Sequence, residues 1–420
     1  GDTCPQSIID ALPDYTADEI REAYDELYEL KKAGQLFAQD DYIDVSRYIP
    51  VNAPVKALCL HVAHDCNLRC KYCFASTGDF GQGRKIMPPD IAKKAIDFVI
   101  ARSGVRHNIE VDFFGGEPLM AWDTVTQTVD YARSLEEKYN KKFRFTITTN
   151  GLLLDEDKRK YINENMDNCV LSLDGRREVN DEFRKTVAGT GSYDTIVPKF
   201  KALVDERDPN LDYYARGTFT SHNLDFAEDV LSIADAGFDR LSVEPVTADP
   251  GCGYDLTEDD LPKIEAEYDR LTDIMLERKK EGKPFTFFHF MVDLDQGPCV
   301  VKRLRGCGAG YEYVAVTPDG DIYPCHQFVG KEEFRQGSVL DQSFDMDIAQ
   351  KFAGMNIYSR PKCQKCWAKF YCSGGCSAAN YNMNHDMNDS YDLGCEMERK
   401  RLECAIYLKA MDKICANQSK

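Results

Sequence analysis

Six short apolar runs, rich in β-branched residues, alternate with amphipathic stretches between residues 57 and 281. In each amphipathic stretch the apolar residues recur with the period of an α-helix. Repeated alternation of this kind predicts parallel strands joined by crossover helices, with the chemistry at the carboxyl ends of the strands. The predicted strands are Ala57–Ala63, Ile109–Phe114, Phe143–Thr149, Val170–Leu173, Tyr213–Phe219 and Leu241–Val246. The predicted helices are Pro89–Arg102, Ala121–Lys138, Asp155–Asn165, Tyr193–Asp205, Asp225–Ala236 and Thr257–Glu281.

The first 52 residues carry a different pattern. Thr16 and Glu19 have the spacing of a capping box, and an apolar stripe with helical period follows them. Gly34 ends this predicted helix, and Leu36–Ala38 and Tyr42–Ile43 read as short strands. The segment is interpreted either as a cap on the main domain or as half of a winged, peptide-binding module.

The strand–helix alternation stops after about residue 285. Tyr311–Thr317 and Asp321–Tyr323 flank Pro318-Asp319-Gly320, which predicts a hairpin with a tight turn. The region that follows is loop-rich and dense in cysteine, so metal centres can hold it together. We therefore predict an N-terminal segment (1–52), an α/β domain (53–284), a bridging region (285–306) and a cysteine-rich domain (307–420).

Charge and cysteine content exclude several classes of protein. The chain has 71 acidic and 52 basic residues, a net charge of -19, which disfavours nucleic acid and favours a neutral or basic peptide as partner. No apolar run approaches the roughly 18 residues that span a bilayer, so no membrane partner is expected. The first thirty residues lack the apolar core of a signal peptide. Seventeen cysteines in such a chain indicate metal or iron–sulfur ligands in a reducing compartment, which we expect to be the cytoplasm.

Three cysteines, Cys66, Cys70 and Cys73, follow the first predicted strand with the spacing CxxxCxxC. Three thiolates on one loop can hold three irons of a 4Fe–4S cluster and leave the fourth iron open to a small molecule. Zinc is the alternative, with His61 and His64 nearby. However, a structural zinc site requires four protein ligands, and catalytic sites favour nitrogen and oxygen ligands. Both histidines fit better as hydrogen-bonded residues at a strand end.

This loop, together with the motif Gly115-Gly116-Glu117-Pro118 after the second strand, resembles that of the radical S-adenosylmethionine (SAM) enzymes. The resemblance implies a partial (β/α)6 barrel of TIM type. It also implies a catalytic 4Fe–4S cluster on Cys66, Cys70 and Cys73, with SAM on the open iron. Tyr72 is then expected near the adenine. The glycines would let the backbone approach the ligand, and Glu117 would accept from the methionyl ammonium.

Further candidates lie in or at the ends of later strands. Ser172 and Asp174 close the fourth strand, and the resemblance implies that their oxygens bind the ribose diol. Arg216 lies within the fifth strand, where a buried cation requires a partner; the resemblance implies the SAM carboxylate. Asn150 and Glu244, which close the third and sixth strands, are further SAM-binding candidates. The alternative for each residue is a structural salt bridge or a turn.

Seven cysteines in the last domain match the pattern CxnGx4C…CxxCx5CxxxC…C, with Gly320 at its glycine. The pattern resembles the SPASM extension of radical SAM enzymes that modify peptides and proteins, which holds two auxiliary 4Fe–4S clusters. Cys299 is the candidate for a fourth inner ligand; without it, one inner iron is open to a substrate thiolate. A zinc ribbon is the alternative from CxxC and CxxxC alone. The implied ligands are Cys363, Cys366, Cys372 and Cys395 for the outer cluster, and Cys307, Cys325 and Cys376 for the inner one.

Longer stretches look like those of the maturases of SCIFF (six-cysteines-in-forty-five) peptides: Lys56–His64, Phe74–Phe80, Phe287–Met291, Asp293–Cys299 and Cys366–Cys376. This resemblance implies that a 5′-deoxyadenosyl radical removes hydrogen from an acceptor residue, often Thr, to which a substrate Cys sulfur then bonds as a thioether. The implied partners are a Cys-rich precursor peptide with a leader, bound by the N-terminal segment, and a flavodoxin- or ferredoxin-like electron donor.

Two other functions stay open. One is a SPASM enzyme of the anaerobic sulfatase-maturing type, which oxidises Cys or Ser to formylglycine. Those enzymes carry Asp directly after the second SPASM cysteine, where this chain has His326 after Cys325. The other is a non-catalytic iron–sulfur or zinc protein that binds a peptide or carries electrons. In that class Glu117 and Arg216 have no evident role.

Overall fold

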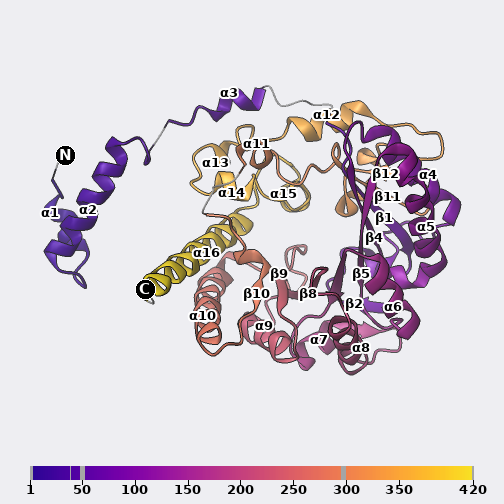
Figure 1. Cartoon of the computed structure of the whole chain (residues 1–420), viewed down its shortest axis with the longest axis horizontal. Helices are drawn as coiled ribbons and strands as arrows, with labels where there is room; N and C mark the ends of the chain where they lie inside the picture. The colour runs from indigo at the N-terminus through magenta and orange to yellow at the C-terminus, as the bar shows by residue number, and fades with distance from the viewer. Residues whose placement is uncertain (1–2, 38, 48–52, 295–298, 419–420) are drawn as a thin grey trace. The chain divides into compact units, whose positions relative to one another are not determined.

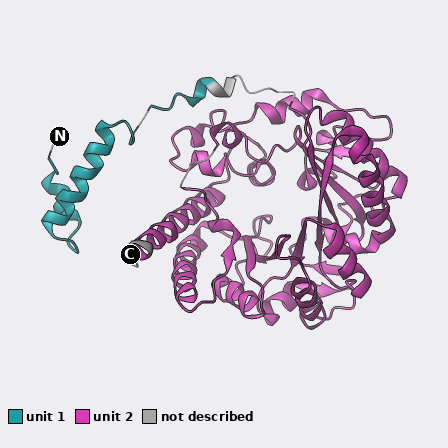
Figure 2. Ribbon diagram, viewed as in Figure 1, with its two compact units in different colours: residues 1–49 teal, residues 50–420 magenta. Residues whose placement is uncertain are grey.

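The computed structural model describes residues 3–37, 39–47, 53–294 and 299–418. The chain forms two compact units, residues 1–49 and residues 50–420 (Figure 2). Within the described residues, no helix combines the length and apolar character needed to span a membrane.

The first unit contains helices α1 (Gln6–Ala11), α2 (Ala17–Lys32) and α3 (Tyr42–Arg47). The predicted capping box is confirmed: Thr16 Oγ1 accepts from the backbone N–H of Glu19, whose side chain accepts from the Thr16 N–H at 2.8 Å. Acidic residues in the first turn of α2 and basic residues in its last turn match the helix dipole.

The two short strands predicted in this unit are wrong within the described residues. Leu36 and Phe37 lie in a bend, in which Phe37 has a φ of 57°, while Ala38 lies outside the described residues. Tyr42 and Ile43 begin helix α3. The carboxylate of Asp40 accepts from the N–H of Tyr42 at 3.3 Å, as in the first turn of a helix, and this local bond outweighs the strand propensity of the two residues. The elements described in this segment are therefore all helical.

The second unit is built on one sheet with the order β10-β9-β8-β6-β5-β4-β1-β11-β12-β13. Neighbouring strands from β1 to β10 pair in parallel, and β10 and β13 lie at opposite ends of the order, so the barrel is open. The predicted partial (β/α)6 barrel is confirmed. Its strands are β1 (Ala57–His64), β4 (Asn108–Gly115), β5 (Lys142–Thr149), β6 (Asn168–Ser172), β8 (Asp212–Phe219) and β9 (Arg240–Pro245).

The predicted helices are also confirmed and lie outside the strands (Figure 1). They are α4 (Pro89–Arg102), α5 (Trp122–Tyr139), α6 (Glu156–Asn165), α8 (Tyr193–Asp205), α9 (Phe226–Asp235) and α10 (Leu261–Lys280). The short elements β2 (Leu68–Cys70), β3 (Lys85–Ile86), α7 (Arg177–Phe183), β7 (Arg184–Thr186) and β10 (Thr286–Phe287) were not predicted. Short 3₁₀ turns add Ser76–Gly78, Pro118–Ala121, Glu258–Asp260, Phe288–Phe290, His326–Phe328 and Glu332–Phe334.

The cysteine-rich region continues the barrel sheet. β11 (Tyr313–Val316) pairs in parallel with β1, and β12 (Asp321–Tyr323) pairs antiparallel with β11, which confirms the predicted hairpin. The last helix packs against α10. The remaining elements are α11 (Val300–Arg303), β13 (Gly337–Ser338), α12 (Met346–Gly354), α13 (Pro361–Gln364), α14 (Lys369–Cys372), α15 (Ser377–Asn384) and α16 (Asp392–Gln418).

The core lies between the sheet and its helices. Strand β5 alternates between exposed and buried residues, and its Phe143, Phe145 and Ile147 are fully buried. The ring of Phe145 stacks on Phe113 of β4, with centroids 5.7 Å apart. Burial of these rings supplies much of the hydrophobic free energy that holds neighbouring strands in register.

We expect Phe145→Ala to lower the free energy of unfolding by about 3–5 kcal/mol, because it removes a buried ring and leaves a cavity. Urea denaturation of the purified protein measures this loss. The control is Val105→Ala at a fully exposed side chain, for which we expect a change within about 0.5 kcal/mol. A loss below about 1 kcal/mol for Phe145→Ala would show that the core relaxes around the cavity.

Candidate active site

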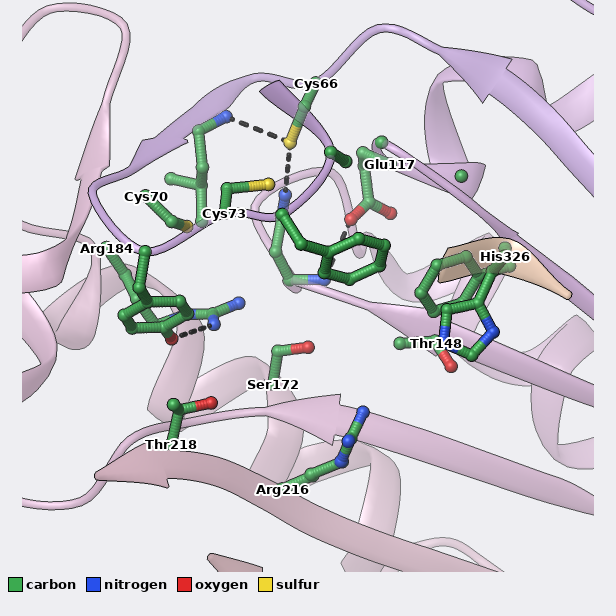
Figure 3. Close-up of a pocket in the computed structure, with 18 of the residues that line it drawn as sticks. Cys66, Cys70, Cys73, Glu117, Thr148, Ser172, Arg184, Arg216, Thr218 and His326 are labelled. Carbon is green, nitrogen blue, oxygen red and sulfur yellow. Dashed lines mark hydrogen bonds between the residues drawn. The ribbon is translucent and has the colours of Figure 1, made fainter. Parts of the chain in front are cut away.

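A cavity of about 290 Å³ opens at the carboxyl ends of the barrel strands (Figure 3). It lies where parallel α/β folds place their chemistry. Pro118 and Asp174 are buried and do not line it. The predicted residues on its wall are Cys66, Cys70, Tyr72, Cys73, Gly115, Gly116, Glu117, Asn150, Ser172, Arg216 and Glu244.

The three-cysteine loop is held at the cavity by strand pairing. Cys70 pairs with Arg184 where β2 runs antiparallel to β7. Cys66 Sγ accepts from the N–H of Leu68 at 3.4 Å and from Asn150 Nδ2 at 3.5 Å. Burial raises the pKa of the Cys66 thiol to about 12 and that of Cys70 to about 11. Iron bound by these sulfurs would have to displace their protons, as metals generally do at thiol ligands.

The structure gives a reason for glycine at positions 115 and 116 that the sequence interpretation did not include. A Cβ on Gly115 would lie 2.2 Å from the carbonyl oxygen of Ala63, and a Cβ on Gly116 would lie 2.1 Å from that of Asp65. Gly115 also has a φ of 131°, which side chains disfavour. Gly116 N–H donates to Ala63 O at 2.7 Å, and Glu117 N–H donates to Asp65 O at 2.9 Å. The glycines therefore let the end of β4 contact the backbone that leads into the cysteine loop.

The Glu117 carboxylate is buried and held by three donors. Oε1 accepts from Leu119 N–H at 3.0 Å and from Thr149 Oγ1 at 2.7 Å, while Oε2 accepts from Asn150 N–H at 2.8 Å. Burial raises the pKa of Glu117, and these hydrogen bonds oppose that rise. Each carboxylate oxygen has two lone pairs, so Oε2 retains capacity to accept a further hydrogen bond from a ligand in the cavity.

Tyr72 is fixed by two charged side chains. Its hydroxyl donates to Asp174 Oδ2 at 2.5 Å and accepts from Arg184 Nη1 at 2.8 Å. Arg184 also lies 3.7 Å from Asp174 Oδ1 and lines the cavity. Asp174, predicted to contact the ribose, lies instead against Tyr72 and accepts from Thr218 N–H at 3.1 Å. Sequence reasoning missed Arg184, because it predicted no strand at β7 and therefore gave this arginine no place near the cysteines.

Arg216 and Glu244 form a bidentate ion pair between neighbouring strands β8 and β9. Nε lies 2.9 Å from Oε1 and Nη2 lies 2.7 Å from Oε2. Burial alone would raise the pKa of Glu244, but the charge and hydrogen bonds of Arg216 outweigh it and bring the pKa to about 2. The charge of Arg216 is thus already compensated by the protein. Figure 3 shows its side chain with Ser172 and Thr218 at the cavity.

Aromatic side chains form another part of the wall. His326, labelled in Figure 3, contacts Phe74 and Phe114, with ring centroids 5.6 and 5.0 Å away, and all three residues line the cavity. Burial lowers the pKa of His326 to about 4. Its Nδ1 lies 3.3 Å from the Tyr313 hydroxyl. Sequence reasoning noted His326 only for its place after Cys325.

His61 and His64 are buried and do not line the cavity. Their rings lie within 3.2 Å, Nδ1 to Nε2, so they contact each other at the end of β1, as predicted for hydrogen-bonded strand-end residues. Among the described residues, His61 Nε2 and His64 Nδ1 have no further hydrogen-bond partner.

A second cavity, of about 350 Å³, is lined by the four cysteines predicted for the outer auxiliary cluster. Cys363 lies on α13, Cys372 on α14 and Cys395 on α16, and Cys366 lies between α13 and α14. Among the described residues, no three Cys, His, Asp or Glu side chains converge as they do around a single metal ion. Four thiols around one cavity suit a cluster, whose sulfur ligands are spread over separate irons. Their role as ligands stays a prediction.

The three cysteines predicted for the inner cluster interact with one another. Burial raises the pKa of Cys325, and the charges of Cys376 and Cys307 add to that rise. Burial raises the pKa of Cys376, and the charge of Glu244 at the first cavity adds to that rise. Cys299, the candidate fourth ligand, is exposed immediately before α11 and lines neither cavity. That it binds iron stays a prediction, as do the roles of the other three.

We expect Gly116→Ala to reduce the iron bound per chain, because its Cβ would displace the backbone at Asp65 and with it the cysteine loop. Iron is measured after anaerobic reconstitution, relative to wild type. Gly354→Ala is the control, since a Cβ there meets nothing within 4 Å. Full iron binding by Gly116→Ala would show that the loop tolerates the displacement.

We expect Asp112→Asn to stabilise the protein increasingly as the pH rises from 5 to 6. Burial, followed by the charge of Glu110, raises the pKa of Asp112 to about 6, so the native state binds more protons than the unfolded state below that pH. Wild-type stability therefore falls by about 1 kcal/mol as the pH rises through this window, and it levels off above about pH 7. Thermal unfolding at pH 5, 6 and 8 measures the difference. Asp259→Asn, at an exposed side chain, controls for the loss of one carboxylate, and an equal response would contradict the assignment.

Comparison with known proteins agrees with this arrangement. Residues 60–214 match the model of the Radical SAM superfamily, and residues 307–367 match that of the SPASM iron-sulfur cluster-binding domain. A cysteine-type anaerobic sulfatase-maturating enzyme of Clostridium novyi (strain NT) is 24% identical over 350 residues, which cover 79% of this chain and 90% of that protein.

Two solved structures share the fold. One is native anSMEcpe with bound AdoMet and Cp18Cys peptide, at a TM-score of 0.68 and 20% identity, covering 85% of this chain and 99% of the other. The second is Streptococcus suis SuiB bound to precursor peptide SuiA, at a TM-score of 0.58 and 17% identity, covering 88% of this chain and 87% of the other. The chain therefore carries a radical SAM domain, which binds a 4Fe–4S cluster and SAM, followed by a SPASM domain, which binds additional iron–sulfur clusters.

Proposed function

We propose that this protein is a radical SAM peptide maturase that forms Cys thioether crosslinks in a ribosomally made, Cys-rich precursor peptide. One observation carries the proposal: residues next to the inner cysteine set line the cavity of the three-cysteine loop. His326 and Gln327, which follow Cys325, line that cavity, and burial together with the charge of Glu244 on its wall raises the pKa of Cys376. A substrate thiol held at the inner set would thus lie beside the place where a radical is generated.

The wall residues suit SAM in this cavity. When bound to Cys66, Cys70 and Cys73, the cluster supplies the electron that cleaves SAM to a 5′-deoxyadenosyl radical. Tyr72, held by Asp174 and Arg184, provides a fixed aromatic face for the adenine. Glu117 is assigned to accept from the methionyl ammonium of SAM. Arg184 and the Arg216–Glu244 pair are assigned to surround the SAM carboxylate. Ser172 and Asn150 are assigned further polar contacts.

The inner set leaves room for a substrate ligand. Cys307, Cys325 and Cys376 account for three thiolates, so a four-iron cluster held by them has one iron without a protein thiolate. Each crosslink removes two hydrogens from the peptide: an acceptor carbon loses one to the deoxyadenosyl group, and the thiol loses a proton. One surplus electron then leaves through an auxiliary cluster.

The structural likenesses support a peptide as the substrate. The anSMEcpe structure contains the Cp18Cys peptide, and the SuiB structure contains the precursor peptide SuiA. A second candidate function is formylglycine formation, favoured by the relation to a cysteine-type sulfatase-maturating enzyme. His326 lines the cavity after Cys325, where enzymes of that type carry Asp, and this difference favours thioether formation.

Mass spectrometry of an anaerobic reaction tests the proposal. The reconstituted protein is reduced with dithionite and supplied with SAM and a Cys-rich precursor peptide. We expect 5′-deoxyadenosine, a loss of two hydrogens per crosslink and thiols that resist alkylation. Cys66→Ala should abolish both products, whereas the control Cys252→Ala, an exposed cysteine that lines neither cavity, should retain them.

Other products would identify the alternatives. Conversion of a peptide Cys to an aldehyde, with no crosslink, would establish formylglycine formation instead. Absence of 5′-deoxyadenosine from protein with full iron content would overturn radical SAM activity itself and favour a peptide-binding or electron-carrying role.

A further inference from the structure

Arg360 is a buried cation for which the described residues provide no carboxylate partner. Its side chain is 2% exposed, and its guanidinium donates to two neutral acceptors: Nε to Met387 O at 3.3 Å and Nη2 to Ser377 Oγ at 2.9 Å. Burying a cation without an opposite charge is costly, since neutral hydrogen bonds replace only part of its hydration. A negative charge from outside the polypeptide would resolve this imbalance.

Burial lowers the pKa of Arg360, and thiolates of both predicted auxiliary sites would raise it. Cys363 and Cys372 belong to the outer set, and Cys376 and Cys307 belong to the inner set. Three helices meet around it: Arg360 directly precedes α13, Gly374 follows α14, and Ser377 begins α15. The guanidinium is thus within electrostatic reach of both cysteine sets.

The chain makes a specific place for this side chain. Gly374 has a φ of +91°, and a Cβ there would lie 2.2 Å from Arg360 Nη1. The guanidinium therefore occupies space that any other residue at position 374 would fill. The backbone carbonyl of Arg360 also accepts from Cys363 N–H at 3.0 Å, which ties the same residue to the first outer cysteine.

We propose that Arg360 is the shared counter-cation of the two auxiliary clusters and that its charge raises the reduction potential of both. The inference rests on the proposed function, in which both cysteine sets bind clusters. Clusters ligated by thiolates carry negative charge, and reduction adds one more, so a fixed positive charge nearby stabilises the reduced state. Arg360 would then favour transfer of the surplus electron from the substrate to the auxiliary clusters, because it makes both of them better electron acceptors.

Redox titration followed by electron paramagnetic resonance tests this role. The titration uses the full chain with Cys66, Cys70 and Cys73 replaced by Ala, so that only auxiliary clusters contribute signal. In this background we expect Arg360→Gln to shift the reduction equilibrium of both clusters about tenfold toward the oxidised state, or about 59 mV downward for a one-electron couple. Arg360→Lys, which keeps the charge, should restore most of the shift. Arg335→Gln, which removes a half-exposed arginine paired with Asp321, should leave both potentials unchanged.

The iron content separates this inference from the proposed function. Iron for two clusters is expected in the starting variant; less iron would overturn the two-cluster assignment before Arg360 is considered, and this inference with it. With two clusters present, unchanged potentials in Arg360→Gln would overturn the inference alone. A shift of only one cluster would contradict the shared role. A further outcome would also overturn the inference: Arg360→Gln loses the clusters and Arg360→Lys loses them too. Lysine keeps the positive charge, so the role of Arg360 would then not be one of charge.

Discussion

The close contact between the end of β4 and the backbone that enters the cysteine loop is the constraint on which the site depends. Gly116 N–H and Glu117 N–H bond to the carbonyls of Ala63 and Asp65, and no Cβ fits at either glycine. The same turn of chain directs the Glu117 carboxylate to Asn150, whose side chain in turn donates to Cys66 Sγ. Backbone proximity, carboxylate position and thiol position are therefore consequences of one contact, and none can be moved separately.

Hydrophobic patterning predicted the barrel because its strands are buried on the side that faces the helices. These patterns involve residues that are close in sequence. One is the alternation of buried and exposed positions in β5 around Phe143 and Phe145, and another is the set of residues that end each element. The N-terminal strands were wrong because Tyr42 and Ile43 are too few to outweigh the Asp40 side chain that starts a helix. A hydrophobic pattern predicts secondary structure reliably when many consecutive residues favour the same element. Two β-prone residues are too few for that.

Site residues were predictable when a motif fixed them and not when a contact between distant segments did. The cysteine spacings predicted three sets of cysteines, and the structure brings the members of each set near one another. Arg184 lay outside any motif: it reaches the site through the pairing of β7 with β2, two short polar strands that no pattern indicates. For the same reason the sequence could suggest a partner for Arg216 but could not show that Glu244, on the neighbouring strand, already compensates it.

The arginines of the two regions differ in how their charge is compensated. Arg216 is paired with Glu244, and Arg184 lies beside Asp174 and Tyr72, so the polypeptide itself compensates the cations of the first cavity. The first cavity can therefore exist with or without its ligand at little electrostatic cost. Arg360 has neutral acceptors and thiols around it instead. Its burial becomes favourable once those thiols are deprotonated by iron, so folding around Arg360 and cluster assembly are expected to be thermodynamically coupled in the C-terminal domain.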